Sequence, residues 1–130
     1  MKILVINGHP DKESYCQAIF QTIVETIDSS RHELKVISLN EEEFDPVLRY
    51  GYRKRMEEDS FILRSQELIQ WADHFIFVYP IWWSSMPSLM KGWIDRVFTP
   101  GIAYSANDQG SFIWNYLRGK QFKKLLKGKT

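Results

Sequence analysis

The chain has 130 residues, of which 44% are hydrophobic and 25% charged, and this composition is that of one folded domain spanning residues 1–130. The longest apolar run, residues 75–83, contains Pro80 and is far shorter than the roughly 20 residues that span a bilayer. No cleavable signal segment opens the sequence, so we expect a cytoplasmic protein without membrane insertion. The single cysteine, Cys16, excludes an internal disulfide and a cysteine-based zinc site.

The net charge of +1 conceals an uneven distribution. Residues 118–130 carry six basic and no acidic side chains, so residues 1–117 carry 11 basic against 16 acidic ones, a net charge of −5. A basic tail can bind nucleic acid, but this one lacks the aromatic interleaving that stacks bases. Its apolar residues instead give one face to a helix: Leu117, Phe122, Leu125 and Leu126. We therefore favour a solvated helix and expect no nucleic-acid partner.

Strand and helix patterns alternate along the first half of the chain. Residues 3–7 form a β-branched run typical of a strand buried on both faces. Ser14 is a candidate N-cap before an apolar stripe at helical spacing that ends at Ile27. Residues 34–39 predict a more amphipathic strand, suited to the edge of a sheet.

The second half continues the alternation after a polar connection. Residues 40–60 indicate a long surface segment with room for a helical turn, and Ser60 opens a helix that runs to Ala72. Residues 75–79 are apolar throughout and predict a central parallel strand. A further helix begins near Pro87, and a Thr-Pro-Gly sequence at residues 99–101 ends it.

This alternation predicts an α/β fold, a doubly wound parallel sheet with right-handed crossovers. In a sheet of order 2-1-3 the carboxyl ends of the first and third strands lie side by side, and ligands bind in the crevice that opens there. The two most unusual loops of the sequence, residues 8–13 and 80–85, leave those two strand ends. We therefore expect the functional site at this edge.

The first loop leads into a helix N-terminus, where unpaired N–H groups and the helix dipole favour an anion. The Ser14 hydroxyl and a donor from the His9 ring would add to a site for phosphate or pyrophosphate. The loop lacks both the Walker A pattern and the Gly-x-Gly-x-x-Gly fingerprint. Taken alone, it is better explained by a serine-capped helix beside an exposed histidine.

The second loop presents two adjacent tryptophans, Trp82 and Trp83, directly after a strand. They could form a stacking platform for a flat heterocycle together with Pro80 and Ile81, or they could pack beneath the following helix. Cys16, in a first helical turn, could be a reactive thiol, but we interpret it as a small buried or ligand-neighbouring residue. No cluster has the spacing of metal ligands, so no metal is expected.

Two stretches resemble the NAD(P)H:quinone oxidoreductase family, whose members have the flavodoxin-like fold. Residues 5–18 (VINGHPDKESYCQA) are similar to its opening strand and histidine-containing loop. Residues 79–98 (YPIWWSSMPSLMKGWIDRVF) are similar to its most diagnostic segment, and residues 102–104 (IAY) to the turn that follows. The resemblance runs through the whole chain in order.

The resemblance implies a flavin, FAD or FMN, with NAD(P)H as co-substrate and a homodimer as the assembly. It implies that five residues hold the flavin phosphate and ribityl region: His9, Ser14, Tyr15, Cys16 and Ala18. It places the isoalloxazine against the second loop: Pro80, Ile81, Trp82, Trp83 and Ser84. Trp83 and Tyr104 would line the catalytic pocket in which nicotinamide and a quinone-type acceptor alternate.

The implied activity is two-electron transfer of hydride from NAD(P)H through flavin N5 to the acceptor. Cys16 departs from the family, which usually has asparagine there. Family members also continue into a fourth and a fifth strand, which are missing from this chain. By this comparison the chain is the N-terminal two-thirds of such a protein, and its third strand would be an exposed edge.

Three other functions remain open. The chain could be a catalytically impaired fragment of such an enzyme, or a regulatory subunit of a potassium-efflux system, as some family members are. It could also be a one-electron carrier like flavodoxin, although those carriers usually lack the double-tryptophan segment. A yellow protein that NADPH bleaches and a quinone reoxidises would favour the enzyme.

Overall fold

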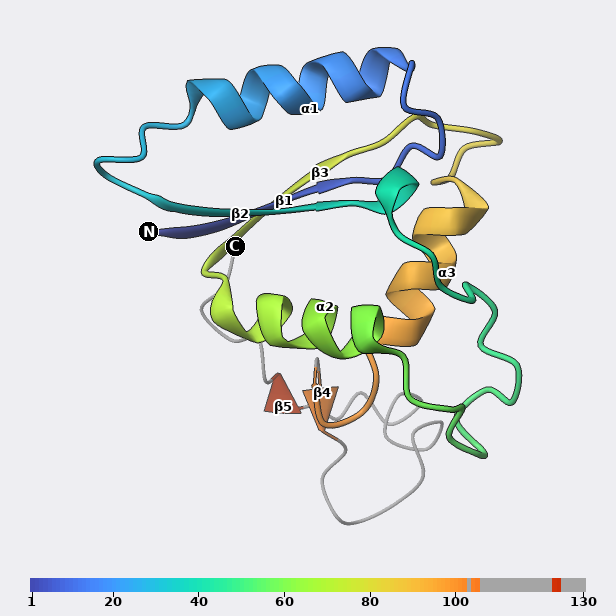
Figure 1. Ribbon diagram of the computed structural model, residues 1–130. Helices are drawn as coiled ribbons and strands as arrows, with labels where there is room; N and C mark the ends of the chain where they lie inside the picture. Colours follow the sequence, from blue (N-terminus) through green and yellow to red (C-terminus); the bar gives the residue numbers. More distant parts are fainter. Residues whose placement is uncertain (103, 106–122, 125–130) are drawn as a thin grey trace.

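A computed structural model describes residues 1–102 together with the backbone of residues 104–105 and 123–124. Helices and strands alternate as expected (Figure 1). The elements in chain order are β1 (Lys2–Asn7), α1 (Tyr15–Thr26), β2 (Glu33–Ser38), the 3-10 turn η1 (Leu39–Glu41), α2 (Ser60–Trp71), β3 (His74–Val78), α3 (Ser88–Val97), β4 (Tyr104–Ser105) and β5 (Lys123–Lys124).

The three long strands form a parallel sheet in the order β2-β1-β3, which confirms the predicted 2-1-3 order. Because β1 is central, it pairs along its length with both neighbours, Ile3 lying opposite Leu34 on one side and His74 on the other. β3 lies at the edge of this sheet in the described part of the chain, and Phe77 is exposed there. Helix α1 covers one face of the sheet, and α2 and α3 cover the other (Figure 1).

Side-chain alternation along β1 divides the core between the two faces. Ile3 and Val5 pack with Phe20 of α1 and Val78. Leu4 and Ile6 face the larger cluster, which takes its other buried residues from β2, η1, α2 and α3: Ile37, Leu39, Phe61, Ile62, Ile69, Ala72, Met90, Trp93 and Val97. Both faces of β1 are covered, and its four inner residues, Ile3 to Ile6, are all apolar and buried.

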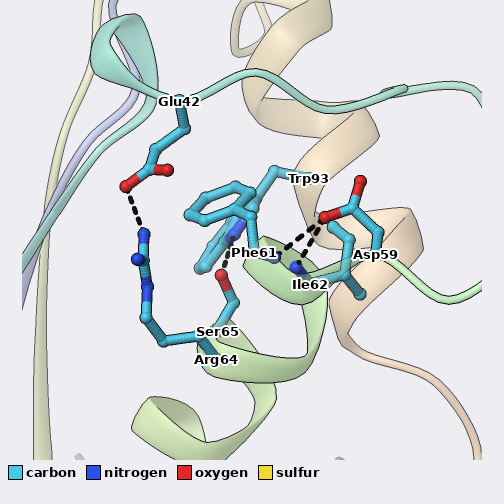
Figure 2. A network of polar contacts seen from close by, with 7 residues as sticks. All are labelled: Glu42, Asp59, Phe61, Ile62, Arg64, Ser65 and Trp93. Atoms are coloured by element: carbon cyan, nitrogen blue, oxygen red, sulfur yellow. Dashed lines mark hydrogen bonds and ion pairs between the residues drawn. The ribbon is translucent and has the colours of Figure 1, made fainter.

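Helix α2 begins at Ser60, as predicted, and the residue before it provides a side-chain cap. Asp59 is the N-cap residue, and its Oδ1 accepts hydrogen bonds from the N–H groups of Phe61 at 2.9 Å and Ile62 at 3.2 Å (Figure 2). Two of the N–H groups that a helix start leaves without intrahelical partners are thereby satisfied.

Replacing Asp59 with alanine is expected to lower the free energy of unfolding by about 1 kcal/mol, because both N–H groups lose their acceptor. Urea-induced unfolding, followed by circular dichroism, measures this change. Asp59→Asn keeps an acceptor oxygen at the same position and is expected to stay close to the native stability. Equal losses in the two variants would contradict a capping role.

The polar connection between η1 and α2 is fastened to α3 at two points. The Arg96 guanidinium, almost fully buried, donates to the main-chain oxygen of Asp45. Beside it, a Cβ atom on Gly92 would come within 2.3 Å of the oxygen of Pro46, so glycine permits this close approach. The connection therefore packs directly against α3.

The solvated helix expected for the basic tail is wrong for two of its residues. Lys123–Lys124 form β5, which pairs antiparallel with Tyr104–Ser105 of β4. The backbone of these two residues pairs with another strand instead of forming hydrogen bonds within a helix. Apolar residues at helical spacing do not exclude such pairing. The rest of the predicted tail helix lies outside the described residues.

Candidate functional site

The two unusual loops meet at the carboxyl ends of β1 and β3, as the predicted topology requires. Asn7 and Val78 are opposite each other in the register, and the N–H of Gly8 donates to the Val78 oxygen at 2.8 Å. Beyond this point the His9 imidazole packs edge-on against the Trp82 indole, with ring centroids 5.4 Å apart. The predicted site residues of both loops thus gather at one edge of the sheet.

A hydrogen bond within the first loop determines which ring nitrogen of His9 carries the proton. The Nδ1 atom of His9 accepts the N–H of Asp11 at 2.9 Å. A neutral imidazole that accepts at Nδ1 carries its proton on Nε2. His9 therefore has a ring N–H available as a donor, as the sequence suggested.

Helix α1 begins at the end of this loop with the predicted serine cap. Ser14 Oγ accepts the N–H of Gln17 at 3.1 Å, so among the described residues the N–H groups of Tyr15 and Cys16 remain for a ligand or water. Tyr15 is 81% exposed, and Ala18 is exposed beside it. The half-buried Cys16 side chain packs against the apolar cluster beneath α1.

The second loop contains a tight turn whose residues are unusual for its geometry. Trp82 and Ser85 exchange two main-chain hydrogen bonds, at 2.8 and 3.0 Å. The two residues between them, Trp83 and Ser84, have φ angles of 51° and 60°. This is the pattern of a type I′ turn, which strongly prefers Asn-Gly because both central residues have positive φ. The turn therefore holds a tryptophan in a strained conformation.

The turn places Trp83 in solvent, with its side chain 100% exposed. Trp82 is 44% exposed and contacts His9, so neither tryptophan packs beneath the following helix, and that alternative is wrong. Ile81 is exposed next to them, and Pro80 is half-buried. Tyr104 belongs to β4, but its side chain lies outside the described residues.

A set of polar residues under the first loop was not identified from the sequence: Asn7, Gln17, Ser38 and Asn40. Asn7 is fully buried, and its amide bonds to Gln17, Ser38 and the main chain of His9. The sequence does contain a signal for Asn7, because it is a polar residue at the end of an apolar strand. A buried amide at such a position needs hydrogen-bond partners.

A hollow of about 420 Å³ lies apart from these loops, between the connection after η1 and the end of α3, and no predicted site residue lines it. Its wall includes Asp45, whose carboxyl has its pKa held below the usual value by the hydrogen bond from Arg49 and then by that from the Val47 N–H. Within the described part of the chain, no three acidic, histidine or cysteine side chains gather as a metal site, and no helix has the length and apolar character to cross a membrane.

Comparison with known proteins agrees with this arrangement. The family model described as flavodoxin-like fold matches residues 1–126, so the chain belongs to that family. The crystal structure of Smu.1420 from Streptococcus mutans UA159 superposes with a TM-score of 0.79 and 33% identity, covering 100% of this chain and 64% of that one. The NAD(P)H:quinone oxidoreductase from Methanothermobacter marburgensis gives a TM-score of 0.69 and 27% identity over 82% of this chain and 57% of that one.

Curated relatives carry related names. The ribosyldihydronicotinamide dehydrogenase-like protein traD of Penicillium crustosum is 29% identical over 133 residues, which cover 88% of this chain and 50% of the relative. The resemblance to NAD(P)H:quinone oxidoreductases is thereby confirmed. The chain spans about half the length of this relative and less than two thirds of both structures.

Proposed function

We propose that this protein binds a flavin at the carboxyl edge of its sheet and takes part in transferring hydride from NAD(P)H to a quinone-type acceptor. The observation that carries the proposal is the contact between His9 and Trp82, which joins the two loops beside a fully exposed Trp83. The names of the relatives support the reaction class.

The residues present fit the parts of a flavin. A flavin joins a phosphate to a flat ring system, and this edge offers an anion-binding helix start and an exposed indole. The N–H groups of Tyr15 and Cys16 and the Ser14 hydroxyl would hold the phosphate, and the Nε2–H of His9 would add a hydrogen bond to it. Trp83 would stack on the ring, because its indole already stands free of the protein core.

The protein's own task is binding and orientation. When bound, a flavin supplies the hydride chemistry, accepting two electrons from NAD(P)H and passing them to a quinone. The turn directs Trp83 toward solvent, where it would border a ring lying on the second loop. Pro80 and Ile81 would bring main-chain groups to the ring edge. Trp83 and Tyr104 are proposed as the catalytic residues that line the pocket for nicotinamide and acceptor.

Reconstitution of the purified full chain tests the proposal. The chain is incubated separately with FMN and with FAD, and binding is followed by quenching of flavin fluorescence. We expect saturable binding of at least one flavin, and oxidation of NADH or NADPH by that complex when a quinone is present. A protein that binds neither flavin contradicts the proposal.

Two histidine substitutions, one in the proposed site and one outside it, extend this experiment. His9→Ala removes a donor to the phosphate and is expected to weaken flavin binding about 10- to 100-fold, as hydrogen bonds to charged groups do. His32→Ala alters a histidine that lies just before β2, at the opposite end of the sheet, and should leave the affinity unchanged. Equal effects of the two changes would place the flavin elsewhere.

Three further properties are part of the proposal. The homodimer follows from the resemblance and the cytoplasmic location from the opening residues of the sequence, while FMN and FAD are alternative cofactors. Light scattering coupled to size-exclusion chromatography determines the number of subunits. Titration with each flavin determines the preferred cofactor.

A further inference from the structure

Four polar side chains form a closed ring of hydrogen bonds beneath the first loop. The Nδ2 atom of Asn7 donates to Gln17 Oε1 at 2.7 Å and to Ser38 Oγ at 3.3 Å. The Ser38 hydroxyl donates to Asn40 Oδ1 at 2.9 Å, and Asn40 Nδ2 donates to the same Gln17 oxygen at 3.1 Å. The ring therefore connects β1, α1 and the turn that follows β2.

The direction of the hydrogen bonds in the ring is fixed by their mutual dependence and by the main-chain N–H of His9. Gln17 Oε1 accepts from two amide groups, so a rotated Gln17 amide would direct its NH₂ group at two other NH₂ groups. A rotated Asn7 amide would likewise place its oxygen against Gln17 Oε1. Either rotation would leave buried polar groups unpaired, and such groups are costly. Reversing all three amides and the Ser38 hydroxyl together would keep the ring closed, but it would direct the Asn7 NH₂ group at the His9 N–H. The ring and the His9 N–H together therefore select one orientation of the Asn7 amide.

This orientation determines where the Asn7 oxygen points. With both Nδ2 hydrogens used in the ring, Oδ1 accepts the main-chain N–H of His9 at 3.1 Å. Asn7 is 0% exposed, so water does not compete for this acceptor. The loop is consequently fixed at the residue whose ring contacts Trp82 and donates from Nε2.

We propose that Asn7 is a positioning residue for His9, and that Gln17 maintains it in that role without touching His9. The ring then makes the placement of His9 depend on α1 and on the end of β2 as well as on β1. The expected effect on flavin binding rests on the proposed function, but the positioning of His9 can be measured without flavin.

The experiment compares two identical substitutions on different helices. Gln17→Met removes the acceptor of two ring bonds. Gln66→Met removes a half-buried amide from α2 whose Nε2 donates to Val97 O at 3.4 Å and to Thr99 Oγ1 at 3.3 Å. Hydrogen exchange of the His9 amide is measured by NMR in the full chain without flavin. We expect exchange about tenfold faster in Gln17→Met, and unchanged exchange in Gln66→Met.

A conservative variant provides the rescue. Gln17 uses only its oxygen in the ring, so Gln17→Glu keeps an acceptor for both Asn7 and Asn40 and is expected to retain native exchange at His9. A general loss of stability would accelerate His9 exchange in both methionine variants. That result would overturn the positioning role, as would native exchange at His9 in Gln17→Met.

Flavin affinity gives the second readout. Gln17→Met is expected to raise the Kd several-fold while Gln66→Met leaves it unchanged. If the native chain binds no flavin, the proposed function fails, and the exchange rates still decide the positioning role. If flavin binds equally well to both methionine variants and His9 exchange is also unchanged, the ring does not position His9.

Discussion

Replacing Trp93 with alanine is expected to lower the free energy of unfolding by about 3–5 kcal/mol, the range for removing a large aromatic side chain from a core. Trp93 is 0% exposed and packs edge-on against Phe98, with ring centroids 5.9 Å apart. It belongs to α3, and its side chain points toward Ser65 of α2 (Figure 2). Since small domains are stable by only about 5–15 kcal/mol, this single change removes a large share of the total. Thermal and urea unfolding measure it.

A second variant separates packing from hydrogen bonding at Trp93. The Nε1–H donates to Ser65 Oγ at 3.1 Å, and Ser65 is also fully buried. Trp93→Phe keeps most of the apolar volume but loses the donor, so we expect a smaller loss than with alanine. Ser65→Ala removes the acceptor and should cost about 1 kcal/mol. A loss below 1 kcal/mol for Trp93→Ala would contradict its placement in the core.

The order of elements was predictable because burial repeats along the sequence with the period of each structure. Ile3 to Ile6 are apolar at every position since β1 is covered on both faces. Ser14 is followed by a stripe at helical spacing, and it does cap α1. The boundaries differ by one residue where main-chain pairing, rather than side-chain burial, decides them. Lys2 joins β1 in this way because it pairs with Glu33.

The position of the candidate site was also predictable, but its contacts were not. Strand order alone brings the loops after β1 and β3 together. The contact between His9 and Trp82 depends on how each loop folds, and the tight turn at Trp83 and Ser84 has none of the Asn or Gly residues that signal such turns. Hydrophobicity alone favours burial of a tryptophan, whereas the backbone of this turn directs Trp83 outward.

Asn7 shows a different limit of sequence reasoning. Its place at the end of β1 was predictable, but its partners come from α1 and from the residues after β2, as distant in sequence as Asn40. A ring of this kind forms only after the sheet and helix have been assembled. The attachment of the long connection after η1 to α3 was equally unpredictable. It depends on a single contact of Arg96, which produces no periodic pattern in the sequence.

Replacing Trp83 with alanine is expected to weaken flavin binding by about 1–3 kcal/mol, the value of stacking a base on an aromatic side chain, which is roughly a 5- to 150-fold rise in Kd. The same change should alter stability by no more than about 0.5 kcal/mol, because the side chain is fully exposed. Fluorescence titration gives the affinity and urea unfolding the stability. Trp93→Ala, the same substitution in the core, should show the large loss of stability instead.

Two further variants determine whether Trp83 acts through its ring. Tyr52→Ala removes another exposed aromatic residue, on the connection after η1, and should leave flavin affinity unchanged. Trp83→Gly relieves the positive φ, because glycine adopts this conformation without steric cost, and should raise stability by up to about 1 kcal/mol while weakening binding as alanine does. The strained tryptophan would then contribute to ligand binding at the expense of stability. Unchanged flavin affinity in both Trp83 variants would remove the ring from the proposed site, and the turn would need another explanation.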